Sequence, residues 1–219
     1  MAALSDTEQT LVVDQAKYFA FGVDDVERRQ ALPGFVEEAT RNAAYKMAET
    51  IDDYIADTLY AAVNNPLGGN DLGAKTIDIS DNNAYGLLVD LRTTLSRDSV
   101  PDEGRWVIVS PEFYAALLQD NRFIDASASG STEALRNGFV GRAAGFNVYE
   151  SNRTPDPTAS TYAIIAGHPM ACTFAMQINK VEAIRREAQF EDGVRGLSLY
   201  GAKVLRSSCL AMASVVVQA

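Results

Sequence analysis

Hydrophobic residues recur every three or four positions over one long stretch of the chain, from about Phe35 to Val63. This spacing places the apolar side chains on one stripe of an α-helix and most charged side chains off it. At 1.5 Å per residue the helix is about 40 Å long, enough to serve as the spine of a domain. The stripe consists of Phe35, Ala39, Ala43, Met47, Ile51, Tyr54, Ile55 and Leu59.

Between Gln9 and Val23 the pattern changes to a period of two, which predicts an extended strand. Neither side of this strand is wholly polar, because Phe19 and Phe21 share one side while Tyr18 lies on the other. Such a strand suits an arm between subunits better than the edge of a compact core, although a sandwich strand has the same pattern.

A second helix is predicted after Ser80 or Asp81, either of which can cap it. Its apolar face consists of Ala84, Leu87, Leu88, Leu91 and Leu95. Residues 97–104 are expected to form a turn, and residues 106–109 a short buried strand. Ser110 and Pro111 then provide a cap and a first helical position for a helix that extends to about Leu118.

The rest of the chain is predicted as loops and strands. Residues 120–133 are rich in Ser, Ala and Gly, which is typical of a loop or a mobile insertion. A buried strand is expected at residues 162–166 and a short helix or turn at 169–176, while residues 178–186 fit either a helix or a strand. Two apolar runs between Val194 and Val217 predict strands that close the fold.

Three glycines, Gly138, Gly141 and Gly145, punctuate the segment from Leu135 to Asn152. The residues after Gly145 alternate between apolar and polar, which predicts a turn that leads into a half-buried strand. The glycine spacing matches neither a Rossmann fingerprint nor a Walker sequence, and no Lys-Ser/Thr pair follows. The segment therefore indicates architecture and not nucleotide binding.

The 219 residues can form one domain or two small ones, and their net charge of −10 disfavours strong direct nucleic-acid binding. The start of the chain lacks the regions of a signal peptide, and no apolar run has the length of a membrane span. A cytoplasmic protein is therefore expected. Cys172 and Cys209 are expected to be buried free thiols, because they lie in apolar surroundings and no close cysteine or histidine pair resembles a metal site.

His168 is the single histidine and lies directly after a predicted strand, where a catalytic base can sit. General-base catalysis also needs a nucleophile and an orienting partner, and no nucleophile motif is found, so a structural or capping role is favoured. Three pairs of carboxylates are noted, of which the helical pair Asp52-Asp53 is interpreted as a solvated face. A short basic cluster can bind an acidic partner, but an inter-subunit salt-bridge surface is favoured. The carboxylate pairs are Asp24-Asp25, Asp52-Asp53 and Glu191-Asp192, and the basic cluster is Arg185-Arg186 with Arg195.

Several segments in order resemble the major capsid proteins of tailed bacteriophages and prophages with the HK97-like fold. No single one is a chemical fingerprint, but together they span about Leu11 to Val217. They are Val12-Val13-Asp14-Gln15 to Arg28, Leu135-Arg136-Asn137-Gly138, Val140-Gly141-Arg142, Gly145 to Asn152, Ala166-Gly167-His168-Pro169, Lys180 to Arg185 and Gly196 to Val204.

The resemblance implies an α+β fold with a peripheral domain built on the long helix, an axial domain and a remnant of an extended loop. The expected divisions are an N-terminal segment with the returning strand of the loop (1–23), the peripheral domain (24–100), the axial domain (101–190) and returning C-terminal strands (191–219). Family members usually have an outgoing loop strand before the returning one, so the chain looks truncated. Since a hairpin strand without its partner has an unpaired edge, residues 1 to about 20 are expected to be displaced, swapped onto a neighbour or mobile.

The implied function is a shell subunit that assembles as hexamers and pentamers into an icosahedral phage head around double-stranded DNA. The implied partners are copies of itself, with scaffolding, protease, portal and decoration proteins, packaged DNA without specific binding, and no membrane. The implied location is the virion capsid, after synthesis in the bacterial host cytoplasm. No catalytic, cofactor-binding or metal residue is assigned, and neither is a crosslink at Lys17. The alternatives are an encapsulin-like compartment and, from another class, a small hydrolase that uses His168.

Overall fold

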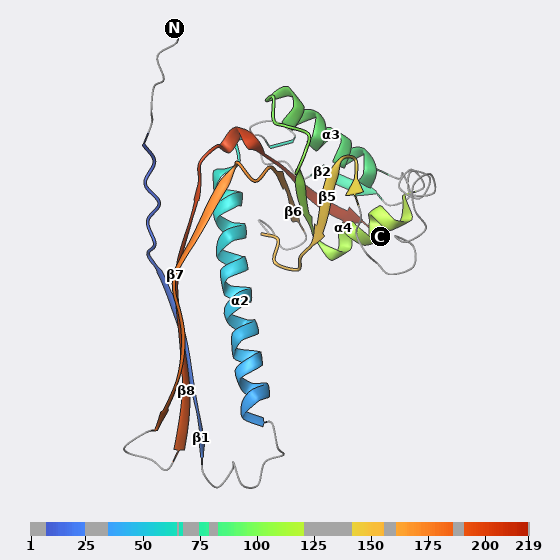
Figure 1. The fold of residues 1–219 in the computed structure, drawn as a ribbon. Coiled ribbons are helices and arrows are strands. Elements are labelled where there is room, and N and C mark those ends of the chain that lie inside the picture. Colours follow the sequence, from blue (N-terminus) through green and yellow to red (C-terminus); the bar gives the residue numbers. More distant parts are fainter. Residues whose placement is uncertain are drawn as a thin grey trace. The chain divides into compact units, whose positions relative to one another are not determined.

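The computed structural model describes residues 8–24, 35–64, 66–67, 75–78, 83–120, 142–155, 161–185 and 191–218 (Figure 1). The chain divides into two compact units. The first contains Met1–Tyr54 and Phe174–Lys203, and the second contains Ile55–Thr173 and Val204–Ala219. Helix α2 (Phe35–Ala62) and strand β7 (Cys172–Arg185) both contribute residues to each unit.

Helix α2 confirms the predicted long helix and ends one residue before Val63. Its residues up to Tyr54 belong to the first unit, where the apolar stripe is half-buried from Ala39 onward. Further along the same stripe, Leu59 is only 3% exposed and packs into the core of the second unit. The periodicity therefore predicted the helix correctly, but it did not predict that the two ends differ in burial.

The first unit contains a three-stranded sheet in the order β1-β8-β7, formed by β1 (Gln15–Asp24), β8 (Glu191–Val204) and β7 (Figure 1). β1 is antiparallel to β8, with Gln15 opposite Tyr200 at one end and Asp24 opposite Glu191 at the other. The predicted N-terminal strand is confirmed from residue 15 onward. Residues 178–185, which fitted either a helix or a strand, belong to strand β7.

The chain before β1 also lies against β8. Lys203 Nζ donates a hydrogen bond to Thr10 O at 2.7 Å, and Gly201 packs against the backbone of Val12 and Val13, where a Cβ atom would clash. The expectation that residues up to about 20 are displaced, swapped or mobile is wrong for residues 10–20. The reason is that β8 supplies a pairing partner from within the chain. Residues 1–7 lie outside the described ranges.

The second unit contains a six-stranded mixed sheet in the order β2-β9-β6-β3-β5-β4. β9 pairs parallel to β2 and antiparallel to β6, and β3 pairs antiparallel to β6 and parallel to β5. The predicted strands near residues 106, 146, 162 and 210 are confirmed. The bounds are β2 (Lys75–Asp78), β3 (Trp106–Val109), β4 (Arg142–Ala143), β5 (Phe146–Glu150), β6 (Tyr162–Gly167) and β9 (Leu210–Gln218), with a short 3-10 helix η2 (Ser207–Cys209) before β9.

The short helix or turn expected at residues 169–176 is a turn only up to Ala171, because β7 begins at Cys172. The end of the expected segment is therefore wrong. Long-range pairing of β7 with β8 outweighs the local preference of this stretch.

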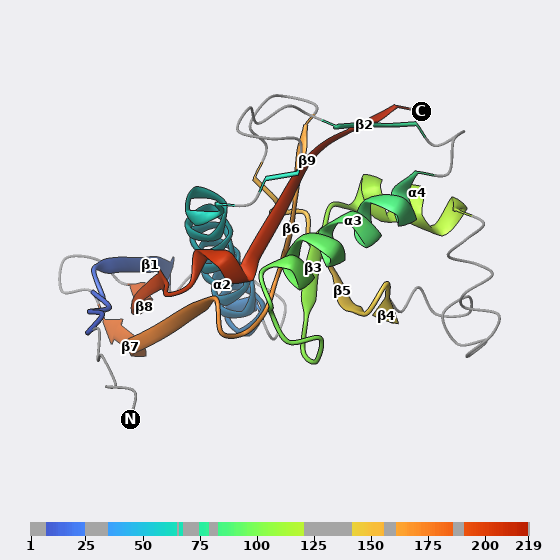
Figure 2. The same cartoon turned by 90° about the horizontal axis from the view of Figure 1, so that it is seen from above.

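Two helices, α3 (Ala84–Arg97) and α4 (Pro111–Gln119), pack against each other and against β9 (Figure 2). The predicted apolar face of α3 is confirmed, since its buried residues are Ala84, Leu87, Leu88, Leu91 and Leu95. These side chains form one core with Val107, Val109, Phe113 and Ile164. The cap of α4 is also confirmed, because Ser110 Oγ accepts a hydrogen bond from the Phe113 N–H at 3.3 Å.

The predicted cap of α3 is wrong. The helix begins after Asn83, whose side chain makes no capping hydrogen bond, whereas Ser80 and Asp81 lie outside the described residues. Instead, the buried side chain of Asp120 accepts a hydrogen bond from the Tyr85 N–H at 3.0 Å. A carboxylate distant in sequence therefore satisfies one of the free N–H groups at the start of α3.

A two-residue turn joins β4 and β5, and both of its residues, Ala144 and Gly145, have positive φ angles of 49° and 85°. This is the backbone of a type I′ hairpin turn, which favours glycine at such positions. The predicted turn into a strand is confirmed at Gly145. Gly138 and Gly141 lie outside the described residues.

Arg105 organises the turn at residues 97–104. It is 2% exposed, and its guanidinium donates to the carbonyl oxygens of Pro101 at 2.8 Å and Val100 at 2.5 Å. It also reaches Ser96 Oγ at 3.1 Å and pairs with Asp102 at 2.9 Å. The sequence pattern predicted the turn but not the buried arginine that holds it.

The two units do not follow the boundaries expected after residues 100 and 190, because the chain divides near residues 54, 173 and 203. Helix α3 was expected in the peripheral domain, which was to end at residue 100. It belongs to the second unit because its apolar face is buried on the sheet there.

Candidate assembly surface

The two units differ in how many apolar side chains they bury. Every member of the buried hydrophobic cluster lies in the second unit. In the described part of the first unit, Tyr200 alone is a buried large hydrophobic residue. A sheet and the larger part of one helix with so little core gain little stability from their own packing, because burial of apolar surface is the main favourable term in folding.

The same unit exposes large apolar side chains. Tyr18 on β1 is 81% exposed, Tyr45 on α2 is 65% exposed and Val181 on β7 is 55% exposed. The other exposed large apolar residues of this unit are Val12, Phe174, Met176 and Leu197. Several such residues on one small unit are typical of a protein interaction surface, whereas scattered single ones are not.

The β1–β8 register assigns these residues to two faces of the sheet. Tyr18 is opposite Leu197, and Ala20 is opposite Arg195, so these four share one face, which we call the Tyr18 face. The Phe19 face carries Phe19, Gly196 and Tyr200. Tyr200 makes an edge contact with Tyr54 of α2, with ring centroids 5.4 Å apart, so the Phe19 face contacts the helix there.

Phe19 also has a specific place on its face. Its ring lies over Gly196, which has no Cβ that would obstruct it. The Phe19 face is thus partly covered within the chain, while Ala16, Tyr18 and Ala20 on the other face are exposed.

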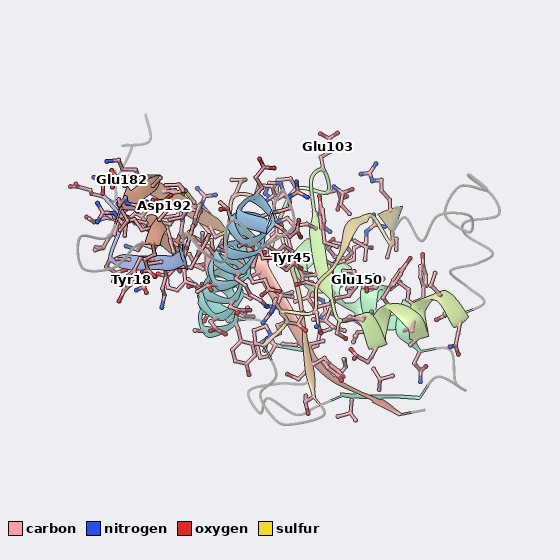
Figure 3. The ribbon with its side chains drawn as sticks, turned by 90° about the horizontal axis from the view of Figure 1, so that it is seen from below. Tyr18, Tyr45, Glu103, Glu150, Glu182 and Asp192 are labelled. Carbon is pink, nitrogen blue, oxygen red and sulfur yellow. The ribbon has the colours of Figure 1, made fainter. Side chains whose placement is uncertain are left out.

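A groove of about 450 Å³ lies along the Tyr18 face. Its lining crosses all three strands and combines an aromatic residue with an ion-pair network. Glu182 of β7 accepts hydrogen bonds from Arg195 of β8 at 2.7 and 3.1 Å and pairs with Lys180. The lining residues are Tyr18, Phe19, Ala20, Lys180, Glu182, Arg195, Gly196 and Leu197, and Figure 3 labels Tyr18 and Glu182 on the two outer strands.

The pKa of Glu182 is lowered to about 2, because hydrogen bonds from Lys180 and then Arg195 stabilise the carboxylate. Two cations therefore share one carboxylate, and the groove lining carries a net charge of +1. Glu191 also belongs to this sheet, but its carboxylate lies over Gly22 and does not line the groove.

Protonation of Glu182 is expected only far below the usual range of a glutamate. In an NMR titration followed down to about pH 2, the Glu182 side chain has its midpoint near the bottom of the range. The folded pKa is depressed, so the ion pairs stabilise the sheet fully above the unfolded value of about 4.3, and this stabilisation is lost as the pH falls below it.

Two variants control this titration. Arg195→Gln raises the midpoint toward about 4.3, because the carboxylate loses its hydrogen bonds from the guanidinium. Arg185→Gln removes a cation that pairs with Asp192 at 2.9 Å and leaves the Glu182 midpoint in place. A midpoint near 4 in the unmodified protein contradicts the ion-pair network.

The basic residues of the sequence were interpreted as an inter-subunit salt-bridge surface, and this stays a prediction; the structure shows the pairs that two of them make within the chain. Arg185 pairs with Asp192, and Arg195 with Glu182, between neighbouring strands of one chain. Pairing of the successive strands β7 and β8 brings these charges together. Arg186 lies outside the described residues.

His168 holds a corner between β6 and β7. Its Nδ1 accepts a hydrogen bond from the Met170 N–H at 3.2 Å, so the ring is the neutral Nε2–H tautomer, and Nε2 donates to Glu103 O at 3.0 Å. Both ring nitrogens are thus engaged with backbone groups. This arrangement supports the structural role that the sequence favoured, because neither nitrogen is directed at a nucleophile.

The other candidate groups do not converge on one site. Both cysteines are free, as expected, but only Cys209 is buried, whereas Cys172 is half-buried. Burial raises the pKa of the Cys172 thiol. In the described ranges, no three His, Cys, Asp or Glu side chains are arranged to hold a metal ion. None of the described helices has the length and apolar character to cross a membrane.

The similarity to known proteins extends over nearly the whole chain and does not depend on one motif. A model of the phage capsid protein family matches residues 7–212. The chain belongs to the phage capsid protein family. No curated protein matches it significantly.

Solved structures agree with the family. A chain from Mycobacterium phage Che8 is 32% identical to this capsid protein with a TM-score of 0.80, and the match covers 97% of this chain and 75% of that one. A capsid structure of the cyanophage P-SCSP1u is 15% identical with a TM-score of 0.74, covering 100% and 81% of the two chains. The SrpI encapsulin complex of Synechococcus elongatus is 14% identical with a TM-score of 0.65, covering 92% and 74%.

The capsid protein therefore has the HK97-like α+β fold that the sequence resemblance implied. It is a major capsid protein, a structural component of the virion capsid that associates with copies of itself in a shell. The groove residues Lys180 and Glu182 were not singled out by sequence reasoning, and neither were Arg105 and Asp120. An alternating charge pattern over residues 180–185 was the available signal for the first pair.

Proposed function

We propose that the capsid protein assembles as hexamers and pentamers into an icosahedral head around double-stranded DNA, and that the first unit makes many of the contacts between copies. The observation that carries this proposal is the poor core of that unit together with its exposed apolar residues. Affinity in such a shell is distributed over many symmetric contacts, so no single residue needs a catalytic role.

In this proposal the unit with β1, β8 and β7 is the peripheral domain, and the unit with the six-stranded sheet is the axial domain. The long helix starts in the first and ends in the second, which suits the role of a spine. The net charge of −10 supports DNA that is enclosed without specific binding, since it disfavours a tight grip on phosphates. Scaffolding, protease, portal and decoration proteins are the further partners of a head of this kind.

The encapsulin alternative shares the fold, but at 14% identity that similarity supports the fold alone. The 32% identity with the Che8 chain favours a phage shell. A small hydrolase is disfavoured by the two backbone hydrogen bonds that engage His168.

Negative-stain electron microscopy of the purified protein, with sedimentation velocity, tests the proposal. We expect rings or closed shells that form more readily as the concentration rises. His168→Ala is the companion variant: it loses two hydrogen bonds, at a cost of about 1 kcal/mol each, and still associates. A protein that stays monomeric at every concentration, or whose activity on a substrate depends on His168, contradicts the proposal.

A further inference from the structure

The groove on the Tyr18 face combines features that a solvated ion-pair surface lacks. Tyr18 is 81% exposed beside Leu197, which is 39% exposed, so apolar area lies open to solvent along the strands. Next to it, the Lys180 and Arg195 side chains are 67% and 58% exposed, while that of Glu182 between them is 33% exposed.

The charges of the groove are unequal. Glu182 is ionised throughout the physiological range and neutralises one of the two cations that contact it. One positive charge remains in the lining, and it lies beside apolar surface, where a partner would exclude water and weaken its screening. We therefore expect a partner that fills this groove to contribute one carboxylate and one apolar side chain.

A second copy of this chain fits that description. The chain carries 29 acidic and 19 basic residues, so its net charge of −10 is complementary to a groove with surplus positive charge. The chain is also a capsid protein, which associates with copies of itself.

We propose that the groove lined by Tyr18, Leu197 and the Lys180–Glu182–Arg195 network receives an acidic segment of a neighbouring copy, and that Glu182 moderates how tightly it binds. This inference rests on the proposed function and adds the site of contact and its charge. Glu182 competes with the incoming carboxylate for the same two cations. The network thus sets the strength of association, in addition to bracing β7 against β8.

Variants that raise or lower the charge of the groove test the proposal, because they are expected to shift assembly in opposite directions. Glu182→Gln raises the lining charge from +1 to +2 and lowers the concentration at half-assembly by about two- to fivefold. Arg195→Gln lowers the lining charge to zero and raises that concentration by a similar factor. The concentration is measured by light scattering and sedimentation velocity near pH 7 in about 50 mM salt, and the difference between the variants shrinks in about 500 mM salt.

Two further variants serve as controls. Arg185→Gln makes the same charge change as Arg195→Gln on the same hairpin, but its partner Asp192 is on the Phe19 face, so half-assembly stays within about twofold of the unmodified protein. The exchange Glu182→Arg with Arg195→Glu keeps both the ion pair and the lining charge, and it assembles as the unmodified protein does. Circular dichroism verifies that each variant is folded.

The outcomes separate this inference from the function on which it rests. Opposite shifts for Glu182→Gln and Arg195→Gln, with Arg185→Gln unchanged, support the groove as a contact site. Shells that form equally well in all variants overturn the groove and leave the proposed function intact, and so does an equal shift for Arg185→Gln. An unmodified protein that never associates overturns both.

Discussion

Replacing Leu91 by alanine lowers the free energy of unfolding of the second unit by about 3 to 5 kcal/mol. Leu91 is 0% exposed on the inner face of α3, within the single cluster that α3 and α4 form with strands β3, β5, β6 and β9. The substitution removes apolar contacts and leaves a cavity, because close-packed neighbours relax only in part. Chemical denaturation followed by tryptophan fluorescence measures the loss, since Trp106 packs against this cluster.

Val89→Ala is the matched control for this prediction. Val89 lies on the same helix but is 41% exposed, so its truncation changes the free energy of unfolding by less than about 0.5 kcal/mol. A loss below about 1 kcal/mol for Leu91→Ala contradicts the core described above.

Replacing Arg105 by methionine destabilises the same unit by about 3 kcal/mol. The methionine fills much of the space but donates no hydrogen bonds, so the carbonyl oxygens of Val100 and Pro101 lose their partner. Buried polar groups without partners are costly, at about 1 to 3 kcal/mol each. Thermal and chemical unfolding measure the loss.

Lysine at position 105 is expected to recover part of the stability. Its single ammonium group reaches one or two of the acceptors, whereas the guanidinium fork serves carbonyl, hydroxyl and carboxylate groups together. Arg97→Met, on the exposed last turn of α3, is the control and costs less than about 1 kcal/mol. Equal stability of the Arg105→Met and Arg97→Met proteins contradicts the role of Arg105.

Elements with a strong local signal were predicted well. The apolar stripe of α2, the five apolar residues of α3 and the Ser110-Pro111 start of α4 all match the structure. Each depends on residues only a few positions apart, so period and capping chemistry are sufficient. The resemblance to capsid proteins was also confirmed, because it rests on segments in order along the chain.

Predictions failed where a distant partner decides the outcome. The cap of α3 comes from Asp120. The residues before and within β1 are held by β8, so the expected displacement of this arm was wrong from residue 10 onward.

For the candidate assembly surface, too, the sequence determined the local features and the tertiary structure decided the rest. Alternation along residues 9–23 was enough to assign two faces to β1 and to show that both carry apolar side chains. It did not show which face is open, because that depends on where β8 and α2 lie: Tyr200 contacts Tyr54 on one side, and Tyr18 is exposed on the other. Local periodicity orients side chains within one strand or helix. Only tertiary pairing decides what covers them, because β1 is far from β7 and β8 in the sequence and meets β8 only in the folded chain.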